Sequence, residues 1–237
     1  MNFYEQENNK TVLKTREIIR ELPEFCNEFF LDLNQNTLPK TRMGYAYDLR
    51  VFFNFLVTEN KEFLGRDIKS LTLDDLQKIK VVDLNQFMDY LAYYVSEEDS
   101  QLYSNGENGK ARKLAAVRKL FKYFYRTEKI SSNPAELTIT PKRHEKEIVR
   151  LEPNEVAEML DVIENGANMT SKQKEYYNKT KTRDLAIVTL LLGTGLRVSE
   201  CVGLDIDDVD FDVNGVRVLR KGSKEMIVYF GEEVEIA

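Results

Sequence analysis

The stretch Gly193-Thr-Gly-Leu-Arg-Val-Ser-Glu-Cys-Val-Gly-Leu204 decides how the rest of the chain is interpreted. It follows an apolar run at 185–192 without a polar face, which predicts the central helix of a core. Arg197 and Glu200 stand three residues apart, a spacing that places both side chains on one helical face. A cation at a buried helix end needs a partner. That partner is either Glu200 or a helix carbonyl, or else an anion such as a phosphate on a ligand.

Downstream of this stretch, the hydrophobic pattern changes from helical spacing to period two, which is typical of strands. Asn214-Gly215 is a strong hairpin signal, and residues 220–225 form a second turn that contains Lys221. We therefore expect a three-stranded antiparallel sheet. Its alternating apolar residues are Val209, Phe211, Val213, Val216, Val218, Met226, Val228 and Phe230.

Upstream, the segment at 139–150 is rich in charge and lacks helical periodicity, which predicts a linker between two domains. We expect a helical domain at 1–138, the linker at 139–150 and the first part of a second domain at 151–237. Residues 165–182 are polar and lysine-rich, and we interpret them as an exposed loop or insertion.

In the first domain, residues 41–56 are expected to form an amphipathic helix with Tyr45, Leu49, Phe52 and Leu56 on its core face. Thr72 is expected to cap a later helix, because two acidic residues follow it in the first turn.

The helix expected at 109–126 has two opposite faces. Leu114, Val117, Phe121 and Phe124 lie on one side, and Arg112, Lys119, Lys122 and Arg126 on the other. A solvated cationic surface is one interpretation of the basic side. However, the cations have no acidic residues at i+4, which favours phosphate contact instead.

Charge is distributed unevenly along the chain. The 237 residues carry a net charge of −6, which by itself argues against a nucleic-acid binder. Residues 101–150, however, hold 12 Lys or Arg against 5 Asp or Glu, a local balance of +7. No apolar run is long enough for a membrane span, and the polar, acidic N-terminus is unlike a signal peptide. We expect a cytoplasmic protein with Cys26 and Cys201 as reduced thiols, without a metal or small-molecule cofactor.

Three motifs in order resemble the tyrosine recombinase (phage integrase) superfamily, Xer-like members in particular. They lie at 182–200, 203–208 and 216–225. The helix that begins at Thr41 and the basic helix that leads to Asn133-Pro134 resemble the SAM-like core-binding domain of that family. The resemblance implies a mainly α fold with a small β part, in which the core-binding domain precedes the first half of the catalytic domain.

The resemblance also implies a DNA strand-exchange enzyme that needs no metal. A tyrosine hydroxyl attacks the scissile phosphate, which gives a 3′-phosphotyrosyl link and a free 5′-hydroxyl. Arg197 matches the first catalytic arginine and would bind two nonbridging phosphate oxygens. Lys221 matches the proton donor to the leaving 5′-oxygen, and Glu200 matches an acidic position that supports the site.

The family also needs a later His-x-x-Arg pair and the nucleophilic tyrosine. After Lys221 there is no arginine or histidine, and Tyr229 is too close to the hairpin to match the nucleophile. We therefore expect that the sequence ends partway through the catalytic domain and that this chain alone does not cleave DNA.

Three functions stay open at this point: the front portion of a recombinase, a non-catalytic DNA-binding relative that competes with an intact one, or a helical interaction module without a DNA role. The first two imply double-stranded DNA as partner, and the first a homotetramer on DNA. The residues expected to contact DNA are Arg42, Arg50, Lys110, Arg112, Lys119, Lys122, Arg126, Lys142, Arg143 and Lys224.

Overall fold

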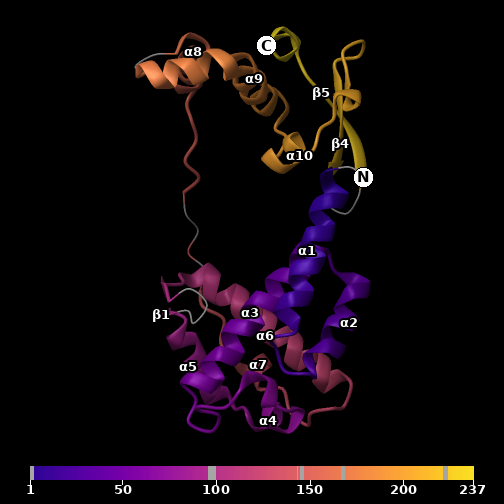
Figure 1. Cartoon of the computed structure of the whole chain (residues 1–237), viewed down its shortest axis with the longest axis vertical. Coiled ribbons are helices and arrows are strands. Elements are labelled where there is room, and N and C mark those ends of the chain that lie inside the picture. Colours follow the sequence, from indigo (N-terminus) through magenta and orange to yellow (C-terminus); the bar gives the residue numbers. More distant parts are fainter. Residues whose placement is uncertain (1–2, 96–99, 143, 145–146, 167–168, 221–223) are drawn as a thin grey trace. The chain divides into compact units, whose positions relative to one another are not determined.

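The computed structural model describes residues 3–95, 100–142, 144, 147–166, 169–220 and 224–237. Within these ranges the fold is mainly helical with two small antiparallel sheets (Figure 1). Cα packing divides the chain into two compact units, unit 1 at 1–146 and unit 2 at 147–237. The prediction of a mainly α fold with a small β part is confirmed.

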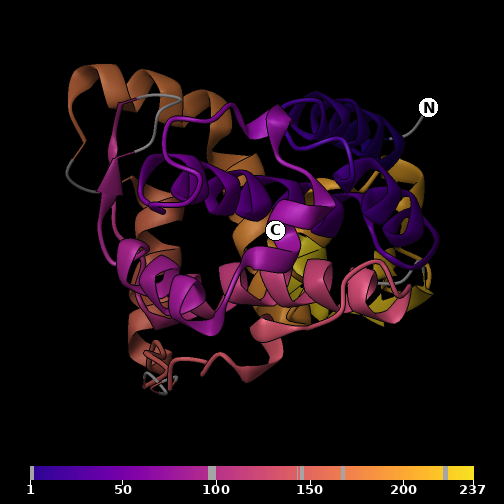
Figure 2. The same ribbon diagram turned by 90° about the horizontal axis from the view of Figure 1, so that it is seen from below.

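Unit 1 is a helical bundle with one short hairpin, drawn from indigo to pink in Figures 1 and 2. Its elements are α1 (Phe3–Ile19), α2 (Cys26–Asn36), α3 (Pro39–Thr58), η1 (Ile68–Ser70), α4 (Leu73–Lys78), α5 (Val81–Tyr90), β1 (Tyr94–Val95), β2 (Leu102–Tyr103), α6 (Glu107–Arg126) and α7 (Pro134–Leu137). Helix α3 packs against α1, α2, α5 and α6, so it lies at the centre of the bundle.

The core of unit 1 follows the predicted periodicity. All four apolar residues expected on the inner side of α6, namely Leu114, Val117, Phe121 and Phe124, are 0% exposed. On α3, Leu49, Phe52 and Leu56 are buried while Tyr45 is only half-buried. Each large side chain taken out of water contributes about 2 kcal/mol, so the apolar faces are what holds the bundle together.

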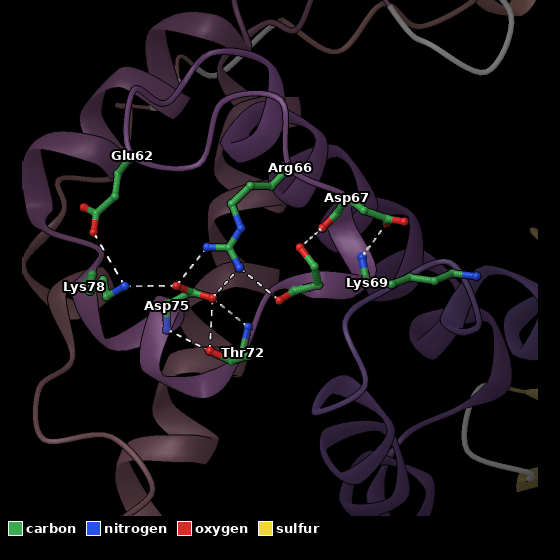
Figure 3. Close-up of polar contacts among 8 residues, drawn as sticks. Glu62, Arg66, Asp67, Lys69, Thr72, Asp75 and Lys78 are labelled. Atoms are coloured by element: carbon green, nitrogen blue, oxygen red, sulfur yellow. Dashed lines mark hydrogen bonds and ion pairs between the residues drawn. The ribbon is translucent and has the colours of Figure 1, made fainter.

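A polar network fastens the loop after α3 to α4 (Figure 3). Thr72 caps α4 as predicted, and the buried Asp75 accepts from its backbone N–H and its hydroxyl, both at 3.0 Å. Arg66 donates to both oxygens of Asp75 at 3.0 and 2.9 Å, and Lys78 donates at 3.1 Å. The bonds from Arg66 hold the pKa of Asp75 well below its usual range.

Unit 2 contains α8 (Pro153–Asn165), α9 (Ser171–Thr194), α10 (Val198–Val202), η2 (Ile206–Asp208), β3 (Val209–Asp210), β4 (Gly215–Arg220), β5 (Lys224–Tyr229) and α11 (Glu232–Ile236). The three strands are antiparallel in the order β3-β4-β5, as the alternation predicted. Asn214 has a φ of 50°, which suits the turn before β4. Phe211 and Val213, expected in a strand, lie in that turn.

Two further predictions for unit 2 are wrong. Most of the loop expected at 165–182 belongs to α9, which Thr170 caps together with Gln173. The first half of α9 is polar on every side, so no hydrophobic period signals it. The apolar run at 185–192 is also not a core helix, because none of the residues of α9 is buried. Leu190 and Leu191 pack against the small core of unit 2, while Ile187 and Leu192 stay exposed.

Candidate functional site

The turn between α9 and α10 positions Arg197. Helix α9 ends with Gly195 in the left-handed conformation at a φ of 65°, and the Gly195 N–H donates to the carbonyl oxygen of Leu191 at 3.0 Å. A glycine takes this conformation without strain. The next side chain, Leu196, is buried in the core of unit 2, and Arg197 is the N-cap residue immediately before α10.

Glu200 fixes Arg197 through two hydrogen bonds. The Glu200 carboxylate accepts from the Arg197 backbone N–H at 2.9 Å and from its Nη1 at 2.8 Å. The bond from the Arg197 backbone N–H is the main reason why the pKa of Glu200 lies below its usual value. The Glu200 side chain is 6% exposed, whereas that of Arg197 is 69% exposed. A guanidinium has five N–H donors, so the pair with Glu200 leaves donors that face solvent. Arg197 can therefore pair with Glu200 and still bind an anion such as a phosphate, so the two interpretations offered by the sequence are compatible.

Arg220 is a second guanidinium at this site, and sequence reasoning missed it. Helix α10 packs against β4, where alternation places Arg220 on the same face as Val216 and Val218. Its charge contributes to the lowered pKa of Glu200. Among the described residues, its buried Nε has no hydrogen-bond partner. The period-two pattern of β4 was the signal that could have identified it.

The register of β4 and β5 places another cation, Lys224, beside Arg220. Lys224, predicted to contact DNA, opens β5 and lies directly opposite Arg220. Like charges at opposed positions destabilise a sheet unless an anion screens them. Lys221, the predicted proton donor, and Arg143 lie outside the described residues. The described cations of this site are thus Arg197, Arg220 and Lys224, an arrangement that suits a phosphate oxyanion.

On unit 1, the predicted cationic face of α6 is exposed, but its residues differ in whether they have an acidic partner. Arg112 donates to Asp48 at 2.6 Å and Arg126 to Asp32 at 3.2 Å. In the part of the chain that the structure describes, Lys119 and Lys122 have no acidic partner. These two lysines are therefore the most available cations of the face.

The other predicted DNA-contacting residues have varied surroundings. The Arg42 guanidinium donates to the Thr37 carbonyl oxygen, and burial lowers its pKa. Arg50 donates to Glu21 at 2.8 Å and lies over the Tyr47 ring. Lys110 is half-buried near the start of α6, and Lys142 is exposed.

Arg118, which lies beside the cationic face, fastens the segment that follows α7. It donates to the Ala135 carbonyl oxygen at 2.9 Å, to the Thr140 hydroxyl at 2.6 Å and to the Thr138 carbonyl oxygen. This segment leads into the predicted linker, so Arg118 sets the direction in which the chain leaves α7.

We predict that Glu200→Ala lowers the free energy of unfolding by about 1–2 kcal/mol, because α10 loses its cap. Glu200→Gln keeps an acceptor oxygen, so we expect it to lower the free energy of unfolding by less than half as much as Glu200→Ala. Urea unfolding measures both values, with the exposed Glu158→Ala on α8 as control. Equal losses for Ala and Gln at position 200 would contradict a capping role.

Among the described residues, no group of three or more His, Cys, Asp or Glu side chains is arranged to hold a metal ion. Within the same ranges, every helix is too short or too polar to span a membrane.

Sequence comparison identifies recombinases. Residues 149–237 match the phage integrase family. Tyrosine recombinase XerC of Caldanaerobacter subterraneus subsp. tengcongensis is 34% identical over 218 residues, which cover 89% of this chain and 55% of that protein. Tyrosine recombinase XerD of Yersinia pestis is 32% identical over 210 residues, which cover 87% of this chain and 60% of that protein. The chain thus spans little more than half the length of these curated relatives.

Solved structures share the fold. The XerH site-specific recombinase bound to a palindromic difH substrate superposes with a TM-score of 0.57 at 20% identity, over 85% of this chain and 52% of that chain. A lambda integrase dimer bound to a COC′ core site gives a TM-score of 0.57 at 12% identity, over 86% of this chain and 59% of that one. These structures show that the fold is shared, and the sequence matches show a phage integrase domain at 149–237 within a chain that is homologous to Xer tyrosine recombinases over most of its length.

Proposed function

We propose that this chain binds duplex DNA and positions a DNA phosphate for site-specific recombination in the cytoplasm. The observation that carries the proposal is the Arg197 guanidinium, which a buried Glu200 holds at 2.8 Å while most of the arginine side chain faces solvent. A rigidly held fork of N–H donors matches the nonbridging oxygens of a phosphate. The relatives described above, which are tyrosine recombinases, support the same reaction class.

In this proposal the residues of unit 2 have separate roles. In the reaction that the resemblance implies, the attacking tyrosine hydroxyl has no match among these 237 residues. As it attacks the phosphorus and the 5′-oxygen leaves, negative charge grows on the nonbridging oxygens. Arg197 stabilises that charge, and Glu200 keeps the guanidinium in place before the reaction starts. Lys221 supplies the proton to the leaving 5′-oxygen. Arg220 and Lys224 add positive charge beside the phosphate.

Unit 1 is proposed to act as the SAM-like core-binding domain. Its contribution is the exposed face of α6, where Lys119 and Lys122 contact phosphates and the apolar side of the helix stays in the core. Each unit would contribute contacts to the duplex. The recombining assembly is proposed to be a homotetramer on DNA.

A second candidate function is a non-catalytic DNA-binding relative that competes with an intact recombinase. It is favoured by one observation: no arginine or histidine follows Lys221 in the 237 residues. Tyr229 is 66% exposed on β5, only eight positions after Lys221. Both candidates predict DNA binding, and both predict that these 237 residues form no covalent link to DNA.

We expect the chain to shift duplex DNA in a gel at low salt and to form no covalent adduct with a nicked suicide duplex. The reason is that Arg197 and the cationic face are present, whereas a matching nucleophile is not. Denaturing gels detect the adduct, and the XerC relative from Caldanaerobacter serves as positive control. An adduct that disappears in Tyr229→Phe would overturn the prediction of inactivity. A chain that fails to bind any duplex at 50 mM salt would overturn the proposed function itself.

A further inference from the structure

A cavity of about 860 Å³ lies in unit 1 between α3, the end of α5, the β1–β2 hairpin and the start of α6. These elements are labelled α3, α5, β1 and α6 in Figure 1. All residues that line the cavity belong to unit 1, whereas Arg197 belongs to unit 2. Its walls combine tyrosine rings, charged side chains and amides, so its surface is suited to a ligand that is both flat and polar.

The aromatic wall is a stack of tyrosine rings. Tyr90 and Tyr94 lie 5.0 Å apart at 26°, and Tyr94 and Tyr103 lie 5.7 Å apart at 21°. Most of the other aromatic pairs of unit 1 meet edge to face, as packed rings usually do. Tyr93 and Tyr103 are 67% and 41% exposed where they line the cavity. A flat aromatic ligand can therefore pack against exposed ring surface.

The polar wall contains a buried acceptor that lacks a hydrogen bond. Asp48 is 1% exposed, and its Oδ2 accepts from Arg112 Nη1 at 2.6 Å. Among the described residues, Asp48 Oδ1 has no partner, although the residue lines the cavity. A buried acceptor without a hydrogen bond costs free energy, which a donor on a ligand would recover. Burial raises the pKa of Asp48 to about 6, so at neutral pH the group is a carboxylate that can only accept.

Cationic side chains form part of the wall of the cavity. Arg50, Arg112 and Lys113 line it, against the carboxylates of Asp48 and Glu59. Lys113 is 7% exposed and donates to Asn105 Oδ1 at 2.8 Å, and burial lowers its pKa. Arg50 also pairs with Glu21 at 2.8 Å, so these cations are matched in number by carboxylates. The side chain of Arg112 is 56% exposed, and its guanidinium keeps N–H donors beyond the one that binds Asp48. Those donors favour a ligand that carries a negative group next to its ring.

We propose that this cavity binds a single nucleotide. Its base packs on Tyr93 and Tyr103, its ring N–H or amino group donates to Asp48 Oδ1, and its phosphate accepts from the exposed guanidinium of Arg112. Two sources share this chemistry: a free nucleotide and an unstacked nucleotide within a DNA strand. Stacking on aromatic side chains is tolerant of base identity, while the acceptor at Asp48 selects bases that present a donor. Binding at this cavity goes beyond the proposed function and does not depend on Arg197.

The test compares two DNA duplexes at pH 7.5, one perfect and one with a single bulged 2-aminopurine nucleotide. The wild-type chain is expected to bind the bulged duplex about tenfold tighter and to quench its fluorescence, as stacking on aromatic side chains predicts. Titration with dAMP in the absence of duplex forms a second arm. Binding of dAMP without a preference for the bulge assigns the cavity to free nucleotides. No preference for the bulge and no binding of dAMP would overturn the proposal.

Variants connect the effect to the cavity. Tyr103→Ala and Asp48→Asn are expected to abolish the tenfold preference, whereas Tyr103→Phe keeps the ring and should retain it. Tyr125→Ala is the matched control, because Tyr125 is 50% exposed on α6 and does not line the cavity. A preference for the bulge that survives both Tyr103→Ala and Asp48→Asn would also refute the proposal. Affinity for the perfect duplex, measured in parallel, reports separately on the proposed DNA-binding function.

Discussion

The double variant Lys119→Glu/Lys122→Glu is expected to bind duplex DNA about 100-fold more weakly than the wild-type chain at 0.1 M salt. Each lysine that contacts a phosphate releases about one counterion, and reversal of its charge also adds repulsion. The two lysines are exposed on α6, whereas the neighbouring arginines share their charge with Asp48 and Asp32. We therefore expect these lysines to account for most of the contribution of α6.

Fluorescence anisotropy across a salt series measures this effect. The slope of log K against log salt should decrease by about 2, one for each lost phosphate contact. Lys61→Glu/Lys69→Glu is the matched control, because it makes the same change of charge at two exposed lysines of unit 1 outside α6. If the control weakens binding as much as the α6 variant does, net charge rather than the helix face governs DNA binding.

The second large effect concerns stability. Asp75→Ala is expected to lower the free energy of unfolding by about 2–4 kcal/mol, because it leaves Arg66 without its buried partner and removes the Asp75 half of the capping box of α4 (Figure 3). For a chain of this size that corresponds to a decrease in Tm of about 5–15 °C. Asp74→Ala removes an exposed carboxylate from the adjacent position and is the control.

The same carboxylate predicts a pH dependence. Because hydrogen bonds from Arg66 hold the pKa of Asp75 below its unfolded value of about 4, the folded state binds fewer protons there. Its stabilising contribution is complete above that unfolded pKa and is lost as the pH falls toward the folded pKa. Urea unfolding between pH 3 and 7 should therefore show the wild type and Asp75→Ala converging at the acid end. A constant difference between them would contradict this linkage.

Several features of the chain were determined by the sequence alone. The two faces of α6 depend on helical spacing, and the β3-β4-β5 sheet depends on alternation and on Asn214-Gly215. The pair Arg197–Glu200 depends on the three-residue spacing of a capping box, because Arg197 is the extended residue before α10. These patterns repeat over a few residues, so backbone geometry converts them directly into neighbouring side chains. Where the pattern is uniform, as in the polar first half of α9, this kind of reasoning failed.

Only the tertiary structure decided which charges meet across elements. Asp48 and Arg112 are 64 residues apart, yet they form an ion pair because α3 crosses α6, and Arg126 reaches Asp32 on α2 in the same way. Arg220 lies near Glu200 because α10 packs against β4. The tyrosine stack and the unpartnered Asp48 oxygen also need several elements at once. Such contacts depend on how helices and strands pack, which no local period encodes. They give the arginines of the α6 face acidic partners, whereas Lys119 and Lys122 have none among the described residues.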